Sequence, residues 1–383
     1  MDFSFTEEQT MIKQTVQDFV QRELVPRLKD LDENQAVLVD VMTKMGKLGL
    51  FGLPFSEEYG GSASGYQSYA IAVEEVARVC ASTAISYAAN CSLGISPIYY
   101  FGTEEQKQAW LPDCIKGTAF AAFGLTEPDA GSDAGGTKTK AILDGDHWLI
   151  NGSKCFITNA TIAKVAVITA VTEPDMGTRG ISCFIIPTDT PGFKVSPPYD
   201  KLGLRASDTA EIILEDVRIP EKNLLGKRGE GFKQFMKILD GGRISIGALS
   251  VGIGQACLDA SLNYARERKQ FNRPIASFQA IQFKLADMAT RVELSRLGVL
   301  RAAWLKDQGL PFTRESAIGK LFASETCAWA ASEAVQIFGG YGYMKDYPVE
   351  KYFRDAKLME IGEGTSEIQR LVIARSLGCP PGI

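Results

Sequence analysis

A single carboxylate near the end of the chain has a setting that suits a catalytic base. Glu363 lies between Gly362 and Gly364, and glycine on both sides gives the backbone unusual freedom and lets another molecule approach closely. Thr365 or Ser366 is predicted to cap the N-terminus of the last helix. A glutamate at such a helix entrance can also be an ordinary capping or surface residue, so its position alone does not establish a base.

The composition leaves few other groups for acid–base chemistry. His147 is the one histidine, so a Ser-His-Asp or Cys-His mechanism would have to use it, and no nucleophile-elbow sequence is present. The 8 cysteines include no C-x-x-C pair, so zinc would find almost no ligands, and reduced thiols are predicted. Acid–base work is therefore expected to fall to carboxylates, lysine or tyrosine, which strengthens the interpretation of Glu363.

Two upstream segments have the character of binding loops. The segment from Phe123 to Gly136 is dense in glycine, serine, threonine and aspartate, and offers N–H groups and hydroxyls to a polar ligand. A solvated linker between domains is the alternative. In Lys154 to Asn159, Phe156 and Thr158 would face the same side of a strand and could present a ring and a hydroxyl to a flat heterocycle. Packing of Phe156 in a β-domain core is the alternative there.

These residues must be positioned by a larger fold. The patterns along the 383 residues predict an α+β chain of several domains. Residues 1–119 are expected to form an N-terminal α-helical domain. Residues 120–225 are expected to form a small central β-barrel or sandwich, because short β-prone runs alternate with glycine and proline. Residues 226–383 are expected to form a C-terminal α-helical bundle of long antiparallel helices.

Local patterns give the expected elements inside these regions. Asp144-Gly145 and Asn151-Gly152 are predicted to be tight turns between strands. Strands are predicted at 165–171, 181–187 and 211–217. Long helices are predicted at 232–268, 281–308 and 313–338. The segment from Tyr69 to Tyr100 is rich in alanine and nearly uncharged, so it is expected to be buried.

Charge and hydropathy exclude several classes of partner. The formal net charge is −5 with no basic block, so a nucleic-acid surface is not expected. The longest apolar stretches are interrupted well before the roughly 20 residues needed to span a bilayer. The first residues, Met1 to Glu8, lack the pattern of a signal sequence. A cytoplasmic protein is expected, and a processed protein of the mitochondrial matrix is not excluded.

From Phe5 to about Leu377, these segments together resemble the acyl-CoA dehydrogenase family of FAD-dependent enzymes. Glu363-Gly364-Thr365 is similar to the family's catalytic motif, and the two upstream segments resemble its flavin loops. Further matches in the family's order are Leu239-Asp240-Gly241-Gly242-Arg243, Arg268-Lys269-Gln270-Phe271 and Gln336-Ile337-Phe338-Gly339-Gly340-Tyr341-Gly342. The resemblance implies a helical, β and helical order of domains, the last a four-helix bundle.

The resemblance also implies a role for each matched residue. Contacts with FAD are implied for Phe123, Leu125, Thr126, Ser132, Phe156, Thr158, Thr365 and Glu367. Contacts with the FAD of a neighbouring subunit are implied for Arg268, Phe271, Gln279, Gln336, Gly339 and Gly340. Binding of the acyl-CoA is implied for Ser132, Asp240, Arg243 and Gly364. Shared FAD sites imply a homotetramer built as a dimer of dimers.

The implied reaction is α,β-dehydrogenation of an acyl-CoA thioester to the 2-enoyl-CoA. Glu363 would abstract the α-proton, flavin N5 would accept the β-hydride, and electron-transferring flavoprotein would be the oxidant. An acyl-CoA oxidase-like use of oxygen is one alternative. A non-catalytic acyl-CoA-binding or assembly protein on the same fold is another, and the retained Glu363 argues against it.

Two positions depart from the commonest pattern of the family. Gly362 stands where an aromatic residue often precedes the base, and Phe156 stands where tryptophan is frequent. Glycine beside the base would open space around the reacting carbons, which favours a branched, alicyclic or otherwise bulky acyl group. Tyr87 would either limit the depth of the pocket, which suits a short chain, or belong to the core. The expected pocket helix, 83–96, has no charged residue, so a neutral acyl chain is favoured over a dicarboxylic one.

Overall fold

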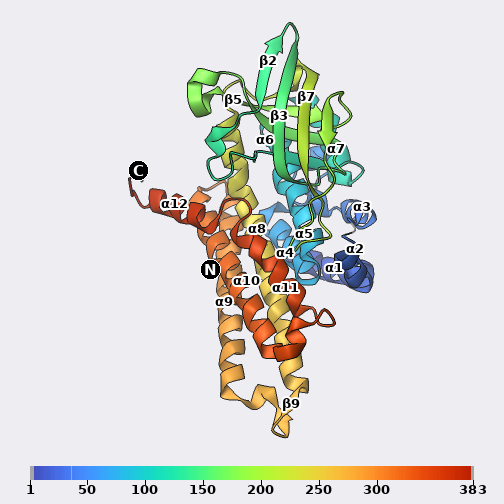
Figure 1. Cartoon of the computed structure of the whole chain (residues 1–383), viewed down its shortest axis with the longest axis vertical. Coiled ribbons are helices and arrows are strands. Elements are labelled where there is room, and N and C mark those ends of the chain that lie inside the picture. Colours follow the sequence, from blue (N-terminus) through green and yellow to red (C-terminus); the bar gives the residue numbers. More distant parts are fainter. Residues whose placement is uncertain (1–3, 36, 381–383) are drawn as a thin grey trace.

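The structure is a computed structural model that describes residues 4–35 and 37–380. Helices form its first part, a sheet follows at one end of the long axis, and a bundle of long helices extends toward the other end (Figure 1). The last helices of the chain return to the middle of the molecule (Figure 1). The helical, β and helical order predicted from the sequence is therefore confirmed.

Seven α-helices precede the sheet in the described part of the chain. They are α1 (Glu7–Glu23), α2 (Leu28–Asn34), α3 (Val39–Lys47), α4 (Gly65–Val79), α5 (Ala81–Ala88), α6 (Ser96–Phe101) and α7 (Glu104–Lys116). A π-helical segment, η4 (Ala89–Ile95), joins α5 to α6. The segment predicted to be buried, from Tyr69 to Tyr100, is mostly buried. π-Helical turns are rare and often lie at functional sites.

The expected β domain is a single sheet of eight strands in the described residues. The strand order is β6-β7-β3-β2-β4-β5-β8, and β1 pairs with β4 in parallel. The strands are β1 (Ala121–Gly124), β2 (Lys140–Asp144), β3 (His147–Thr158), β4 (Val165–Val171), β5 (Ile181–Pro187), β6 (Phe193–Val195), β7 (Thr209–Pro220) and β8 (Leu224–Leu225). Trp148 and Phe184 pack together in its core.

One of the two predicted turns in the sheet is wrong. Gly145 has φ +63° in the tight turn between β2 and β3, as expected. Asn151-Gly152 instead lies inside β3, where the pairing with β7 shifts its register. Gly152 is required there because an added Cβ would lie 2.5 Å from Thr139 Oγ1. The dipeptide marks a β-bulge, which uses glycine for the same conformational reason as a turn.

The long helices at the C-terminal end form the bundle. They are α8 (Gly231–Glu267), α9 (Gln279–Asp307) and α10 (Thr313–Phe338), followed by the shorter α11 (Val349–Ala356) and α12 (Ser366–Ser376). A two-stranded hairpin of β9 (Lys269–Gln270) and β10 (Arg273–Pro274) joins α8 to α9 at the far tip (Figure 1). On α9, Met288, Val292, Ser295 and Val299 are buried against the rest of the bundle.

Helix α8 is the centre of the bundle and packs against α4, α9 and α10. Its glycines permit this packing: an added Cβ at Gly252 would lie 2.4 Å from the carbonyl oxygen of Glu74 on α4. Within the described residues, α8 is also the one helix long and apolar enough to cross a membrane by length and composition. Because 78% of that window is buried inside the protein, its apolar character serves the core.

Candidate active site

The loop between α11 and α12 holds Glu363 in an unusual backbone conformation. Glu363 has φ +52° and Gly364 has φ +95°, both in the left-handed region. A residue other than glycine adopts this region at a cost of about 1–2 kcal/mol, so the surrounding structure must hold the loop. Thr365 caps α12 by accepting a hydrogen bond from the N–H of Ile368, which confirms the predicted cap.

The Glu363 carboxylate lies against α8 and the π-helical segment. Its Oε2 atom is buried and has no hydrogen-bond partner among the described residues. A Cβ added at Gly242 would lie 1.8 Å from Oε2 and 3.2 Å from Leu93 Cδ2. Gly242 therefore leaves the space that the carboxylate occupies. A buried acceptor without a partner in the protein suits a group whose proton comes from a ligand.

Burial raises the pKa of Glu363 to about 7, and the charges of Lys320 and Arg243 partly oppose this rise. A base with a pKa near 7 is well matched to proton transfer at neutral pH. Arg243 is buried on α8, forms an ion pair with Asp240, and has its own pKa lowered by burial. The structure thus brings predicted substrate residues Asp240 and Arg243 to the same side of α8 as the base.

Two side chains that the sequence did not single out hold the loop. Lys320 on α10 is fully buried, and its Nζ donates to the carbonyl oxygen of Gly364 at 2.8 Å. Gln369 on α12 donates to the carbonyl oxygens of Glu363 at 3.2 Å and Gly364 at 2.8 Å. The sequence does carry one signal for Lys320: it is the one charged residue in the small and apolar run from Ala317 to Ala323. A lysine in such a run is expected to have a specific partner, because lysine is almost never fully buried without one.

The first predicted flavin segment leaves β1 and runs beside β3. Phe123 stacks on Phe235 of α8 with 4.0 Å between ring centroids. The carbonyl oxygen of Leu125 accepts from Lys154 Nζ, and that of Thr126 accepts from the N–H of Cys155. Ser132 is exposed farther along the loop. The segment is thus tied to the sheet, and the alternative of a merely solvated linker does not describe it.

The second predicted flavin segment is strained at Phe156. The register of β3 against β7 shifts between Lys154 and Ile157, and Phe156 has φ +59°. Its side chain is 67% exposed and leans on Tyr199, with 5.5 Å between ring centroids. Packing of Phe156 in the β-domain core is therefore wrong. Thr158 is partly exposed while Ile157 between them is buried, so both predicted side chains lie on the accessible face.

A buried ion pair fastens these two segments to each other. Lys154 is 0% exposed, and its Nζ lies 2.6 Å from Glu127 Oε1. Glu127 also accepts from the backbone N–H groups of Lys138 and Thr139. The charge of Lys154 and these hydrogen bonds hold the pKa of Glu127 below its usual value despite burial. The loop from Leu125 to Thr139 is therefore closed around one carboxylate.

Replacing Lys154 by methionine is expected to lower the free energy of unfolding by about 3–5 kcal/mol, because it leaves Glu127 buried and unpaired. Denaturant unfolding of the purified variant measures this loss. Lys138→Met is the matched control: it breaks an ion pair with Asp129 on the same loop, where both side chains are 70% exposed. That pair is expected to contribute about 1 kcal/mol or less. Equal losses of unfolding free energy in the two variants would show that the buried Lys154–Glu127 pair contributes no more than the exposed Lys138–Asp129 pair.

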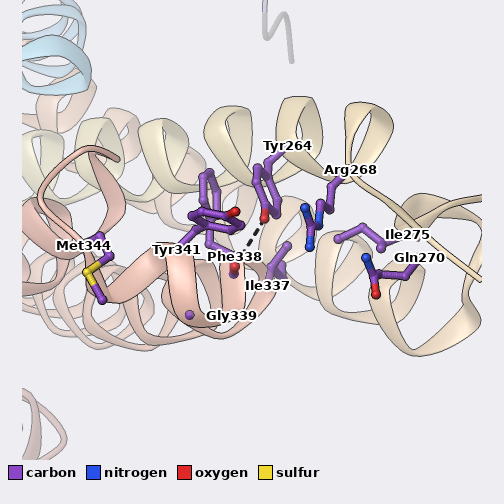
Figure 2. Close-up of a pocket in the computed structure, with 10 residues that line it drawn as sticks. Tyr264, Arg268, Gln270, Ile275, Ile337, Phe338, Gly339, Tyr341 and Met344 are labelled. Atoms are coloured by element: carbon purple, nitrogen blue, oxygen red, sulfur yellow. Dashed lines mark hydrogen bonds between the residues drawn. The ribbon is translucent and has the colours of Figure 1, made fainter.

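A second group of predicted cofactor residues lies around a cavity at the far end of the bundle. The cavity has a volume of about 530 Å³ and is lined by residues that include Arg268, Gly339 and Gly340. Figure 2 shows Tyr264 and Arg268 beside Phe338 and Tyr341, with a hydrogen bond from the Tyr264 hydroxyl to the Phe338 carbonyl. A Cβ added at Gly339 or Gly340 would meet nothing within 4 Å, so their backbone is open to a ligand.

Within one chain the structure does not bring the two groups of predicted cofactor residues together. The hairpin of β9 lies at the far tip of the bundle (Figure 1). Phe156 and Thr158 lie instead near the end of β3 that meets α5, where the Asn159 side chain donates to the carbonyl oxygen of Ser86. Phe271 in the far hairpin is 87% exposed with φ +51°, Gln279 begins α9, and Gln336 is exposed on α10. Thr365 and Glu367 lie instead at the start of α12, next to the base. A site that uses both groups needs two subunits.

The residues present fit a flavin dinucleotide. An exposed, strained aromatic beside a polar loop offers a face to a flat ring, and an open glycine pair beside Arg268 suits a phosphate group. Ser366 Oγ and Gln369 Oε1, next to the base, are buried without hydrogen-bond partners in the described part of the chain. No cluster of three metal-ligating side chains occurs among the described residues. Seven of the 8 cysteines are buried free thiols, and Cys379 is exposed.

Comparisons with known proteins agree with this arrangement. Family models match residues 6–118, 122–217 and 229–378 as the N-terminal, middle and C-terminal domains of acyl-CoA dehydrogenase. A probable acyl-CoA dehydrogenase YngJ from Bacillus subtilis is 61% identical over 378 residues, with 98% of this chain and 100% of the relative covered.

Two solved structures share the whole fold. Butyryl-CoA dehydrogenase from Megasphaera elsdenii has a TM-score of 0.97 and 42% identity, covering 98% of this chain and 100% of that one. A chain from a study of the electron transferring flavoprotein of Acidaminococcus fermentans has a TM-score of 0.97 and 47% identity, covering 98% and 99%. The chain therefore belongs to the acyl-CoA dehydrogenase family, whose members are FAD-dependent flavoprotein oxidoreductases.

Proposed function

We propose that the protein converts a short, branched or alicyclic neutral acyl-CoA into the 2-enoyl-CoA, with Glu363 as the base that removes the α-proton. The observation that carries this proposal is the Glu363 carboxylate, buried, unpartnered at Oε2 and with its pKa raised to about 7. The structure offers this carboxylate a fixed position against Gly242. Membership of the family supports dehydrogenation of an acyl-CoA as the general reaction.

The proposed mechanism assigns three tasks to the loop around Glu363. Oε2 takes the proton from the α-carbon of the thioester, a weak acid whose ionisation needs a desolvated base. The backbone N–H of Glu363 donates to the thioester oxygen as negative charge develops there, a contact of a kind worth about 3–4 kcal/mol in comparable sites. The left-handed backbone at Glu363 and Gly364 aims the side chain at α8. FAD, when bound, would supply the acceptor for the β-hydrogen, which would leave as hydride.

We propose binding roles for the residues that the sequence identified. Phe123, Leu125, Thr126, Ser132, Phe156, Thr158, Thr365 and Glu367 would hold FAD of the same chain. Arg268, Phe271, Gln279, Gln336, Gly339 and Gly340 would hold FAD of a neighbouring subunit, with the cavity of Figure 2 as its recess. Ser132, Asp240, Arg243 and Gly364 would contact the acyl-CoA. The ion pair of Asp240 with Arg243 gives this last group a fixed geometry.

The proposed substrate class rests on the space beside the base. A Cβ added at Gly362 would meet only Leu358, at 3.5 Å from its carbonyl oxygen, so the position has room for part of a substrate. The wall formed by α5 and η4, Ala81–Ile95, contains no charged side chain. A neutral acyl group is therefore favoured, because a second carboxylate would be buried there without a cation. The butyryl-CoA dehydrogenase relative supports a short chain.

Gly362→Tyr is expected to lower kcat/KM for a branched or alicyclic acyl-CoA by about tenfold or more relative to butyryl-CoA, because the ring would fill the space beside the base. Gly362 does not have a positive φ, so the backbone accepts a side chain. The ratio of kcat/KM values for isobutyryl-CoA and butyryl-CoA measures the effect. Equal or better turnover of the bulky substrate by the variant would count against this substrate class.

We also propose a homotetramer, oxidation by an electron-transferring flavoprotein, and a cytoplasmic location. Large apolar side chains on the outer faces of the bundle support association: on α9, Phe283 is 64% and Leu294 is 53% exposed. The similarity to a chain from a study of an electron transferring flavoprotein supports the electron acceptor. The Bacillus subtilis relative supports the location.

Anaerobic mixing of the FAD-bound protein with a panel of acyl-CoAs tests the proposed function. Bleaching of the flavin absorbance by a short neutral acyl-CoA is the expected result. Rapid formation of hydrogen peroxide in air would favour the oxidase-like alternative. A colourless protein that cannot be reconstituted with FAD, yet binds acyl-CoA, would favour the non-catalytic alternative.

A further inference from the structure

Lys320 is a buried cation that the mechanism above does not use. It lies on the face of α10 that packs against α8, and a Cβ added at Gly247 would lie 3.7 Å from its Cα. Its side chain is 0% exposed. Removal of an ammonium group from water costs several kcal/mol after relaxation, so a lysine at this depth needs compensating contacts. Among the described residues, its ammonium group donates one hydrogen bond, to the Gly364 carbonyl oxygen in the loop of the proposed base.

Two side chains from different helices converge on one carbonyl oxygen in that loop. Lys320 Nζ and Gln369 Nε2 each donate to the Gly364 carbonyl oxygen at 2.8 Å. This carbonyl belongs to the residue directly after the base, in a stretch where both residues adopt left-handed backbone. Since this conformation is unfavourable for Glu363, external donors are required to hold it. The charged donor is the stronger of the two.

Charged groups on three elements act on Glu363 and Lys320. Arg243 lies on α8 with its partner Asp240, Glu325 lies on α10, and Glu360 lies on η10 (Lys357–Glu360). Burial lowers the pKa of Lys320 to about 8, while Glu363 acts in the opposite direction. Burial raises the pKa of Glu363 to about 7, and Lys320 is the first of the charges that oppose the rise.

We propose that Lys320 is a positioning residue for the base: its ammonium group fixes the Gly364 carbonyl and, by its charge, favours the ionised form of the Glu363 carboxylate. The inference rests on the proposed role of Glu363. Lys320 contacts the loop and not the reacting atoms, so its loss changes the protonation and placement of the base. The Glu363 pKa is lowered by a neighbouring cation, so it must rise when that cation is removed, and the base is then protonated at pH 7.

Lys320→Met in the FAD-bound protein tests this role by direct titration of the carboxyl group. Infrared difference spectra across pH follow the protonated Glu363 carboxyl band, identified as the band that Glu363→Gln lacks. The midpoint is expected near pH 7 in the unsubstituted protein and higher by about one pH unit or more in the variant. The rate of flavin reduction by butyryl-CoA is expected to fall at pH 7 and to recover at higher pH.

Two further variants separate charge from hydrogen bonding. Lys320→Arg keeps the charge and is expected to restore a midpoint near that of the unsubstituted protein. Lys320→Gln keeps a donor for Gly364 without the charge, so the loop is retained and the midpoint is expected to rise as in the methionine variant. Lys194→Met removes an exposed lysine paired with Glu215 on the sheet and is the control for a change of one unit of charge.

The inference is overturned if the carboxyl midpoint and the pH profile of Lys320→Gln match those of the unsubstituted protein. The inference is also overturned if Lys194→Met raises the midpoint of the Glu363 carboxyl titration as far as Lys320→Met does. Failure of the proposed function gives a different result, because no acyl-CoA would then bleach the flavin of the unsubstituted protein. The carboxyl titration does not depend on turnover, so the two failures are distinguishable.

Discussion

Glu363→Gln is expected to lower the rate of flavin reduction by an acyl-CoA by about 10²–10⁴-fold, while the affinity for acyl-CoA stays close to that of the unsubstituted protein. Glutamine has the same shape but cannot accept the α-proton. In the structure Oε2 has no described hydrogen-bond partner that the substitution would disturb. Anaerobic stopped-flow absorbance gives the rate of flavin reduction, and the spectral change on binding gives the affinity. The large ratio between the two effects is the signature of a base, because a residue that only bound substrate would change both.

Glu215→Gln on β7 is the matched control, because it makes the same chemical change at a carboxylate that is 61% exposed and paired with Lys194. Its rate of flavin reduction is expected to be unchanged. A Glu363→Gln protein that still reduced its flavin at the original rate would show that the base has been misassigned. A variant that lost both acyl-CoA binding and flavin content would instead point to a structural role for the loop.

The order of elements could be predicted because their patterns are strong and local. The strands 165–171 and 181–187 and the helix 313–338 match β4, β5 and α10 at both ends. Gly180 precedes β5, Pro187 ends it, and Gly339 follows α10; the effect of such residues on a boundary is local and does not depend on tertiary contacts. Asn151-Gly152 was misassigned because the same dipeptide serves a turn and a bulge, and only the partner strand decides between them.

The site was predicted in part, and the missing part comes from contacts between distant segments. Glu363, Phe156 and Thr365 carry local signals, such as flanking glycines and a capping pattern. The left-handed φ of Phe156 and the burial of Lys320 arise from packing of β3 on β7 and of α10 on α8. Gly247 leaves room for the backbone of Lys320, and the Gly364 carbonyl oxygen accepts a hydrogen bond from its Nζ. These glycines lie 73 residues before Lys320 and 44 residues after it in the sequence.

The two groups of predicted cofactor residues lie apart within one chain. Arg268 and Gly339 line a cavity near the tip of the bundle, whereas Phe156 lies on β3 of the sheet, away from that tip (Figure 1). No local pattern in the sequence states which residues act across a subunit boundary. The resemblance to the family supplied that assignment, and the separation of the two groups in one chain is what such sharing requires.

Gly242→Ala is expected to reduce the rate of flavin reduction by about 10²-fold or more with little loss of stability. The added Cβ would lie 1.8 Å from Glu363 Oε2, so the carboxylate must leave the position it occupies in the structure. The carboxylate is the end of a flexible side chain and can move, and alanine is favoured over glycine inside a helix by about 1 kcal/mol. The fold is therefore expected to tolerate the change, while a displacement of about 1 Å at a reacting group can cost 10²-fold in rate.

Gly298→Ala on α9 is the control for a glycine-to-alanine change inside a helix of the same bundle. An added Cβ there would meet only Gly319 Cα, at an ordinary contact distance of 3.7 Å. Both variants are expected to unfold at denaturant concentrations near that of the unsubstituted protein, and Gly242→Ala alone is expected to lose activity. Full activity in Gly242→Ala would mean that the carboxylate can work from another position. In that case the close packing of the base on α8 would not be part of the mechanism.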